Sequence, residues 1–344
     1  MGFSLFARKR ARALLGLINI AIAIATVQVV AARETGPRPE FPAVSVAQEA
    51  ATIEGLRVEP ADVLAGSARV AAPVARNQPL ATRAVASSKM PIAGKGMWIW
   101  LFDEVEGGNP ARIVRRAKML GLSHIYVRSS STTSGFKYLH HIDRVVPVAH
   151  AAGLKVIAWD FPTLKNPVGD AHRVARVISH RTPGGERVDG MAIDLETPSE
   201  GVHLTAGRAL QFSRTLARLR PTSFRVLVPP RPSPSMQKRY PYGIIRYYSA
   251  VAPMVYWISR DPLATVRSAI FFLRKFHKPI APIGQAYDAS VDGGPAGSPS
   301  GATLLAFAEQ ARRAGAVGVS FWSWQHATSD ELRGIARISF PVSL

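Results

Sequence analysis

The chain from Gly96 onward alternates short apolar runs with longer amphipathic stretches, and this alternation restricts the fold more than any other feature. Eight apolar runs follow one another, roughly thirty residues apart: Met97–Leu101, His124–Val127, Lys155–Trp159, Met191–Leu195, Arg225–Val228, Ala252–Tyr256, Ile280–Ile283 and Val317–Phe321. The clearest helices are expected at Ala111–Leu120, Arg144–Ala152, Leu204–Leu219, Pro262–Phe276 and Ala302–Ala314. This pattern over about 250 residues predicts a (β/α)8 barrel.

A doubly wound open sheet is the competing fold. Such sheets usually have fewer strands, and a glycine-rich turn with GxGxxG spacing often follows the first one. Here the first run is followed by the acidic segment FDEVEGGNP, which lacks that spacing. The barrel is therefore the preferred prediction.

The first third of the chain has a different composition. Four basic residues between Arg8 and Arg12 precede an apolar run, Ala13–Ala32. This order is typical of export signals, so residues 1–32 are predicted to be a cleaved signal peptide or a retained signal anchor. Residues 33–94 are rich in Ala, Pro and Arg and are predicted to form a linker without fixed structure, which leaves 95–344 for the barrel. Either N-terminal alternative puts the barrel outside the cytoplasm, secreted or at the cell surface.

Charge and cysteine content narrow the chemistry. The 344-residue chain has no cysteine, which excludes disulfides and thiol catalysis, and its net charge is +20. The charge reflects either a preference for arginine or attraction to a polyanion such as an anionic wall polymer. No basic block is interleaved with aromatic residues, so nucleic-acid binding is not expected. His140 and His141 have no third ligand at a useful spacing, and neither a metal nor a cofactor is predicted.

Active sites of barrels of this type lie at the carboxyl ends of the strands. Carboxylates, aromatic rings and polar side chains are concentrated there, the mixture that sugar binding needs. The candidate catalytic residues are Asp194 and Glu196. The candidate substrate-binding residues are Trp98, Arg128, Asp160, Tyr256, Gln285, Asp288, Trp322 and Trp324.

The segment DGMAIDLE, residues 189–196, carries the two candidate catalytic acids. Side chains alternate along a strand, so Ala192, Asp194 and Glu196 should share the face that points into the barrel. The intervening apolar residues should pack on the helices. Repulsion between the two carboxylates should raise the pKa of at least one of them, as a general acid requires. The alternative is that Glu196 lies in a solvated loop and Asp194 caps a turn.

Three motifs resemble family 18 glycoside hydrolases, the chitinase-like barrels. Residues 189–196 resemble that family's DGxDxDxE signature, MVY at 254–256 its Met-x-Tyr, and GVSFW at 318–322 its strand-eight motif. The resemblance implies that Glu196 protonates the leaving oxygen and that Asp194 orients the substrate N-acetyl group, which acts as nucleophile. It also implies that Tyr256 hydrogen-bonds that group and that Trp322 forms the floor of the subsite.

Two positions differ from the family pattern. Ala192 stands where the family has an inner Asp, and Trp257 stands where an Asp or Asn is usual. A barrel of the family 25 lysozyme type, which also has an Asp-x-Glu on a central strand, therefore remains an alternative. If a second carboxylate acts directly, Asp288 and Asp160 are the candidates.

The sequence thus predicts an exported, monomeric glycoside hydrolase that acts on a β-linked amino-sugar polymer, such as a cell-wall glycan or chitin. A glycan-binding barrel that has lost catalysis is the alternative function. Contact with the membrane is expected only through the N-terminal segment.

Overall fold

The computed structural model describes residues 90–340, and these form a parallel eight-stranded sheet in the order β6-β5-β4-β3-β2-β1-β8-β7. Strand bounds are β1 Gly94–Ile99, β2 His124–Ser131, β3 Lys155–Phe161, β4 Gly190–Asp194, β5 Arg225–Val228, β6 Ala250–Val251, β7 Ile283–Gln285 and β8 Gly318–Trp322. Each expected apolar run overlaps or borders its strand.

Strands β6 and β7 close the sheet into a barrel. Parallel bridges join Val251 to Ile280 and Met254 to Ile283. The amide of Ile283 donates to the carbonyl of Pro253, and the amide of Val255 donates to Ile283. Proline has no N–H to donate, which accounts for a regular β6 shorter than the apolar run that predicted it. The (β/α)8 barrel is confirmed.

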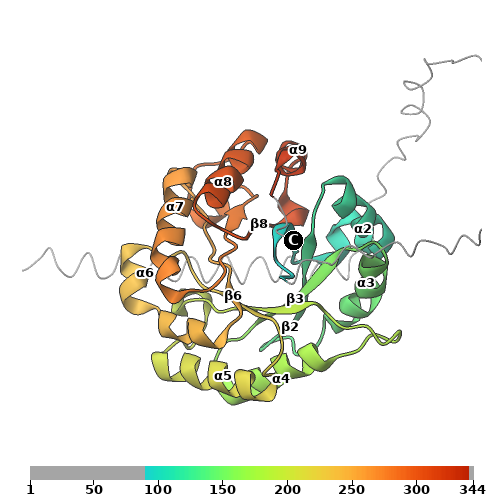
Figure 1. Cartoon of the computed structure of the whole chain (residues 1–344), viewed down its shortest axis with the longest axis vertical. Coiled ribbons are helices and arrows are strands. Elements are labelled where there is room, and N and C mark those ends of the chain that lie inside the picture. The colour runs from blue at the N-terminus through green and yellow to red at the C-terminus, as the bar shows by residue number, and fades with distance from the viewer. Residues whose placement is uncertain (1–89, 341–344) are drawn as a thin grey trace, which may run out of the picture. The chain divides into compact units, whose positions relative to one another are not determined.

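Helices surround the strands, as the ring of labelled helices in Figure 1 shows. They are α2 Pro110–Met119, α3 Leu139–Ala151, α4 Pro167–Ser179, α5 Ala206–Leu219, α6 Pro234–Arg239, α7 Pro262–Leu273, α8 Gly301–Arg313 and α9 Ser329–Arg337. Several begin with a side-chain cap followed by proline: Asn109, Asn166, Ser233 and Asp261 each accept a backbone N–H of the first turn. Capping and the fixed φ of proline therefore fix where these helices start.

Apolar side chains pack in two separate layers. Met191, Ile193 and Leu195 belong to the larger layer between strands and helices, whereas Ala192 belongs to the layer inside the barrel. This is the alternation expected for the segment DGMAIDLE. Ile92 is also fully buried inside the barrel, so the last residues assigned to the linker are part of the folded domain.

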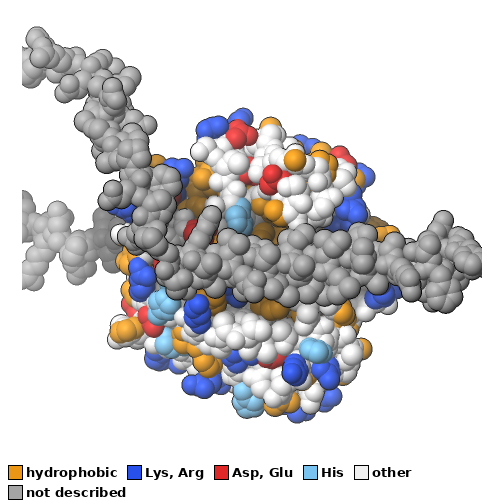
Figure 2. Space-filling view, turned by 180° about the vertical axis from the view of Figure 1, so that it is seen from behind, with side chains coloured by type: hydrophobic (Ala, Val, Ile, Leu, Met, Phe, Trp, Pro, Cys, Tyr) orange, Lys and Arg blue, Asp and Glu red, His pale blue; other side chains and the backbone are white. Residues whose placement is uncertain are grey.

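The predicted signal segment, and the linker up to residue 89, lie outside the described residues. Within residues 90–340, no helix is both long enough and apolar enough to cross a bilayer. Basic side chains are scattered over the face of the molecule seen in Figure 2, with acidic and neutral ones between them. The positive charge is thus spread over this face, as it is along the sequence.

Candidate active site

Strand β4 ends at Asp194, at the carboxyl end of the barrel. Its Oδ1 atom is buried and, within residues 90–340, accepts no hydrogen bond. Burial raises the pKa of Asp194 to about 7, and the negative charge of Glu200 adds to the effect, whereas Arg128 opposes it. At neutral pH this carboxyl is therefore poised between its charged and neutral forms.

Glu196 lies two residues further along the same face. Its pKa is well above the usual range because the carboxyl is buried and because Asp194, Glu200 and Asp292 all place negative charge near it. The carboxyl therefore holds its proton to a higher pH than a solvated glutamate does, and the protonated form is the state from which a general acid acts. Behind it, the hydroxyl of Tyr240 donates to the carbonyl of Leu195 at 3.0 Å and fixes the backbone between the two acids.

Two tyrosines face these carboxylates. Tyr256, after β6, packs edge to face against Tyr287, after β7, with 5.6 Å between ring centroids. Burial raises the pKa of Tyr256 well above its usual value, and Tyr287, Asp194 and Glu196 raise it further. The hydroxyl of Tyr287 donates to the carboxylate of Asp292. Tyr256 therefore stays protonated and is available as a hydrogen-bond donor beside the two acids.

Arg128 supplies positive charge at this end of the barrel. Its guanidinium lies over the ring of Tyr138 at 4.3 Å and over that of Trp159 at 5.5 Å, and its Nε is buried with no acceptor in the described part of the chain. Burial lowers its pKa, and the charges of Tyr138, Asp160 and Asp194 act in the opposite direction. Arg128 thus partly offsets the negative charge of Asp194.

Trp322 ends β8 and is half-buried, as is Trp100 after β1. Their rings lie 6.3 Å apart with an angle of 27° between planes. Trp322 also contacts Trp159 edge to face at 5.7 Å. The peptide bond after Trp322 is cis. Because Trp100 and Trp322 are only half-buried, their rings are partly open to solvent, as sugar stacking requires.

Five of the ten predicted site residues, Arg128, Asp194, Glu196, Tyr256 and Trp322, are thus placed at the carboxyl end of the barrel. The electrostatic coupling of Asp194 to Arg128, and of Tyr256 to both acids, shows that at least four of them are neighbours. The other five lie elsewhere or have different partners.

The two tryptophans among those five are buried in the cores. Trp98 is 1% exposed, stacks on Tyr126 at 3.9 Å inside the barrel and donates from Nε1 to Ser320. Trp324 is 4% exposed and packs in the layer beneath the helices. The expectation that they bind substrate is corrected, because neither ring is accessible.

Asp160 does not point into the barrel. It is paired in register with Ile193 of the outer layer, and it is fully buried. The guanidinium of Arg173 on α4 donates to both of its oxygens, at 2.9 Å from Nε and 2.8 Å from Nη2. Ser130 also donates to it. Asp160 is therefore corrected from a substrate contact to one half of a buried ion pair.

Gln285 and Asp288 hold loops in place. The side-chain oxygen of Gln285 accepts the amide of Ile258 at 3.0 Å, which ties the segment after β6 to β7. The carboxylate of Asp288 accepts the amides of Ser290 and Gly297, and these bonds lower its pKa. Gln285 is buried and both of its polar atoms are bonded, so its assignment to substrate binding is corrected. Asp288 is half-buried, and only its Oδ1 is bonded within residues 90–340, so its assignment stays a prediction.

Trp100, Glu200, Tyr287 and Asp292 also contribute to this site, although none of them was among the ten predicted site residues. The signal for Trp100 was present, because it shares the inward face of Trp98 and lies two residues nearer the strand end. The signal for Asp292 was absent, because Asp292 lies beyond the end of β7 and is held there by the hydroxyl of Tyr287. Periodicity does not predict such a contact.

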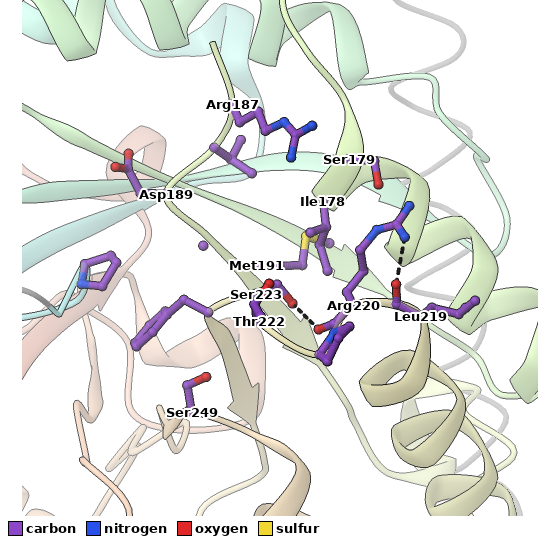
Figure 3. Close-up of a pocket in the computed structure, with 15 residues that line it drawn as sticks. Ile178, Ser179, Arg187, Asp189, Met191, Leu219, Arg220, Thr222, Ser223 and Ser249 are labelled. Carbon is purple, nitrogen blue, oxygen red and sulfur yellow. Dashed lines mark hydrogen bonds between the residues drawn. The ribbon is translucent and has the colours of Figure 1, made fainter.

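A cavity of about 850 Å³ lies at the opposite end of the barrel, around the start of β4 and β5 (Figure 3). Asp189 lines it, and its carboxylate accepts the backbone N–H of Val156 at 2.8 Å and pairs with His150 and Lys155. The first acid of the DGMAIDLE segment therefore joins β3 to β4 at their amino ends and is remote from Asp194. Over residues 90–340, no cluster of His, Asp and Glu has an arrangement that would hold a metal ion.

No family model matches the chain. Solved structures with the same fold include a family 18 chitinase from Pseudoalteromonas aurantia, with 13% identity, a TM-score of 0.52 and a match covering 72% of this chain and 100% of that one. An endo-1,4-β-mannanase from Rhizomucor miehei has 10% identity and a TM-score of 0.52 over 68% of this chain and 87% of that one. A protein proposed to be an α-L-fucosidase, from Bacteroides thetaiotaomicron, has 11% identity and a TM-score of 0.53 over 78% and 100% of the two chains.

These identities show the fold alone. The chain has the barrel fold of glycoside hydrolases, family 18 among them, as the resemblance of the three motifs predicts.

Replacing Asp194 with Asn tests the electrostatics of the site. A folded-state pKa of about 7 means that the native protein keeps a proton which the unfolded chain releases near pH 4. Wild type should therefore lose stability as pH rises from 4 to 7, and the variant should lose less. We expect a difference on the order of 4 kcal/mol at pH 7 and almost none at pH 4 in urea unfolding. Parallel pH profiles would contradict the assigned pKa.

Proposed function

We propose that the protein hydrolyses glycosidic bonds of a β-linked amino-sugar polymer, a cell-wall glycan or chitin, with Glu196 as general acid. The observation that carries this proposal is the raised pKa of Glu196, which lies beside Asp194 at the carboxyl end of a glycoside hydrolase-like barrel. An acid whose pKa is raised in this way keeps its proton to a higher pH and can deliver it to a leaving oxygen.

The neighbouring groups support a division of roles. In the proposed complex Asp194 and Tyr256 hold the N-acetyl group of the sugar, which attacks the anomeric carbon while Glu196 protonates the departing oxygen. Trp322 and Trp100 provide the aromatic faces against which the ring lies. Arg128 takes over part of the charge control that the missing acid at Ala192 would exert, because it lowers the pKa of Asp194.

We further propose that the barrel works outside the cytoplasm, secreted or held at the cell surface by residues 1–32. The support is the basic and apolar order of that segment. Polymeric wall glycans and chitin are found on that side of the membrane, so the location and the substrate class agree.

Wild type should release short products from wall glycan or from chitooligosaccharides. Trp322→Ala should weaken binding of the same oligosaccharides by about tenfold, because a buried aromatic contact contributes roughly 0.5–1.5 kcal/mol beyond its area. Product analysis and calorimetric titration provide the two measurements, and thermal melting checks the fold.

Binding without cleavage would instead support the alternative, a barrel that binds glycans without turning them over. If the protein neither binds nor cleaves any amino-sugar glycan, both the hydrolase function and the glycan-binding alternative are overturned.

A further inference from the structure

A basic groove of about 1050 Å³ lies between α6 and α7, on the flank of the barrel. It is distinct from the carboxyl-end site, because none of the candidate catalytic residues lines it. The lining residues that matter for binding are Arg231, Arg260, Arg267, Phe271, Phe272 and Lys275.

Positive charge dominates the groove. Four of its residues, Arg231, Arg260, Arg267 and Lys275, are cations, and within residues 90–340 none of them is in an ion pair. The single carboxylate, on Asp261, accepts the amide of Ala264 as the cap of α7. Arg231 is half-buried and close enough to Arg260 for the like charge to lower its pKa, in addition to the larger effect of burial. An anion bound between these two arginines would relieve that repulsion.

Aromatic surface lines the same groove. Phe271 is 77% exposed. The ammonium of Lys275 lies over the ring of the neighbouring Phe272, 3.8 Å from its centroid, in a cation–π contact. An exposed phenylalanine of this size is uncommon unless something packs on it. Flat rings next to cations suit a ligand that presents both C–H faces and anionic groups, as an acidic sugar does.

The groove starts near the candidate active site. A parallel β-bridge joins Pro230 to Met254. Arg231 therefore lies beside the residues that precede Tyr256, at the carboxyl end of the barrel. From Arg260 the lining positions recur at helical spacing along one face of α7, whose 12 residues extend about 18 Å. The groove therefore follows α7 away from the carboxyl end and is long enough for several sugar units.

We propose that this groove binds the carboxylate-bearing part of an acidic polysaccharide, whose chain continues from the site at Asp194 and Glu196. This inference rests on the proposed function, and it narrows the substrate class from amino-sugar glycans in general to acidic ones. Arginine favours it because the planar guanidinium forms paired hydrogen bonds with a carboxylate.

The test compares two double variants with the same change in charge. Arg260→Gln/Arg267→Gln removes two cations from the groove. Arg115→Gln/Arg337→Gln removes two exposed arginines on α2 and α9 that have no ion pair within residues 90–340. The probe is hyaluronate, a carboxylate-bearing amino-sugar polymer, in affinity electrophoresis at low and at physiological salt. We expect about tenfold weaker retardation for the groove variant and less than twofold for the control, with both folded by thermal melting.

Equal losses in the two variants would overturn the proposal, because they would show a response to net charge alone. Tighter binding of a single-stranded oligonucleotide than of hyaluronate to the same groove would overturn it in favour of nucleic acid. Binding is measured without turnover, so the two proposals can fail separately. Hyaluronate binding through the groove without any hydrolysis contradicts only the enzyme, whereas hydrolysis of neutral chitooligosaccharides without groove binding contradicts only this inference.

Discussion

Glu196→Gln should reduce glycan hydrolysis by about 10²–10⁴-fold while the protein stays folded and still binds its glycan. The amide has the size of the carboxyl group but carries no proton that it can give to a leaving oxygen. The substitution also replaces a buried, repelled acid with a neutral group, so the free energy of unfolding should not fall. Initial rates on wall glycan or chitooligosaccharides, with titration of the same ligand, provide the measurement.

The matched control is Glu309→Gln, on the outer surface of α8, where Glu309 is paired only with Arg313. It should leave the rate unchanged, because an exposed ion pair of this type contributes little. A variant at Glu196 that retains its rate would show that another group protonates the leaving oxygen. Loss of activity accompanied by unfolding would withdraw support from the catalytic assignment.

The pH dependence should agree with this role. A general acid must be protonated, so the rate should fall as pH rises through the pKa of Glu196, which lies well above the usual glutamate range. Activity should therefore persist to a higher pH than the pKa of an ordinary solvated glutamate would allow.

The barrel itself could be predicted from the sequence because its signal is repetitive. Apolar runs with helices between them leave few folds open, and the alternation in residues 189–196 sets which side chains point inward. Helices α4, α6 and α9 were not among the clearest predicted ones. The first two start at proline after an Asn or Ser cap, in loops that composition alone marks as irregular.

The candidate site could be predicted only in part, because strand-end position does not tell which way a side chain faces or what it already binds. Trp98 and Trp100 share one face of β1 and the residues after it, yet only Trp100, which lies beyond the strand end, is half-buried and reaches solvent. Asp288 has the right position, but Oδ1 of its carboxylate accepts two backbone amides of its own loop. The first outcome depends on tertiary packing that no local pattern contains, whereas the second depends on a cap within the loop itself.

Asp160 is the clearest case in which the position at a strand end did not tell which way the side chain faces. The register between β2 and β3 shifts between Arg128 and Ser130, and this irregularity lets the Ser130 hydroxyl reach Asp160 on the outer side of the sheet. Strict alternation would have placed Ser130 inside with Arg128. The sequence therefore suggested a polar rim at a place where the fold has a buried network.

Arg173→Met should destabilise the protein by about 3–5 kcal/mol, since it removes the cation shared by two buried carboxylates. Arg173 donates to both oxygens of Asp160 and to Asp170, and Asp170 in turn accepts the amide of Leu164 at 2.9 Å and the hydroxyl of Thr132. Without the guanidinium, Asp160 keeps only the hydroxyl of Ser130 as a partner in a fully buried position. Urea unfolding at pH 7 measures the loss.

Arg176→Met, one turn further along α4, is the matched control. Its guanidinium is exposed and lies 4.8 Å from the ring of Phe136, so its removal should cost about 0.5–1 kcal/mol. The double variant Asp160→Asn/Arg173→Met should recover part of the lost free energy of unfolding. The asparagine side chain is neutral, so this variant does not leave the charge of Asp160 buried without its arginine partner. If Arg173→Met unfolds at the same urea concentration as Arg176→Met, Asp160 is not held by an ion pair, and the sequence-based assignment of this carboxylate to the substrate would have to be restored.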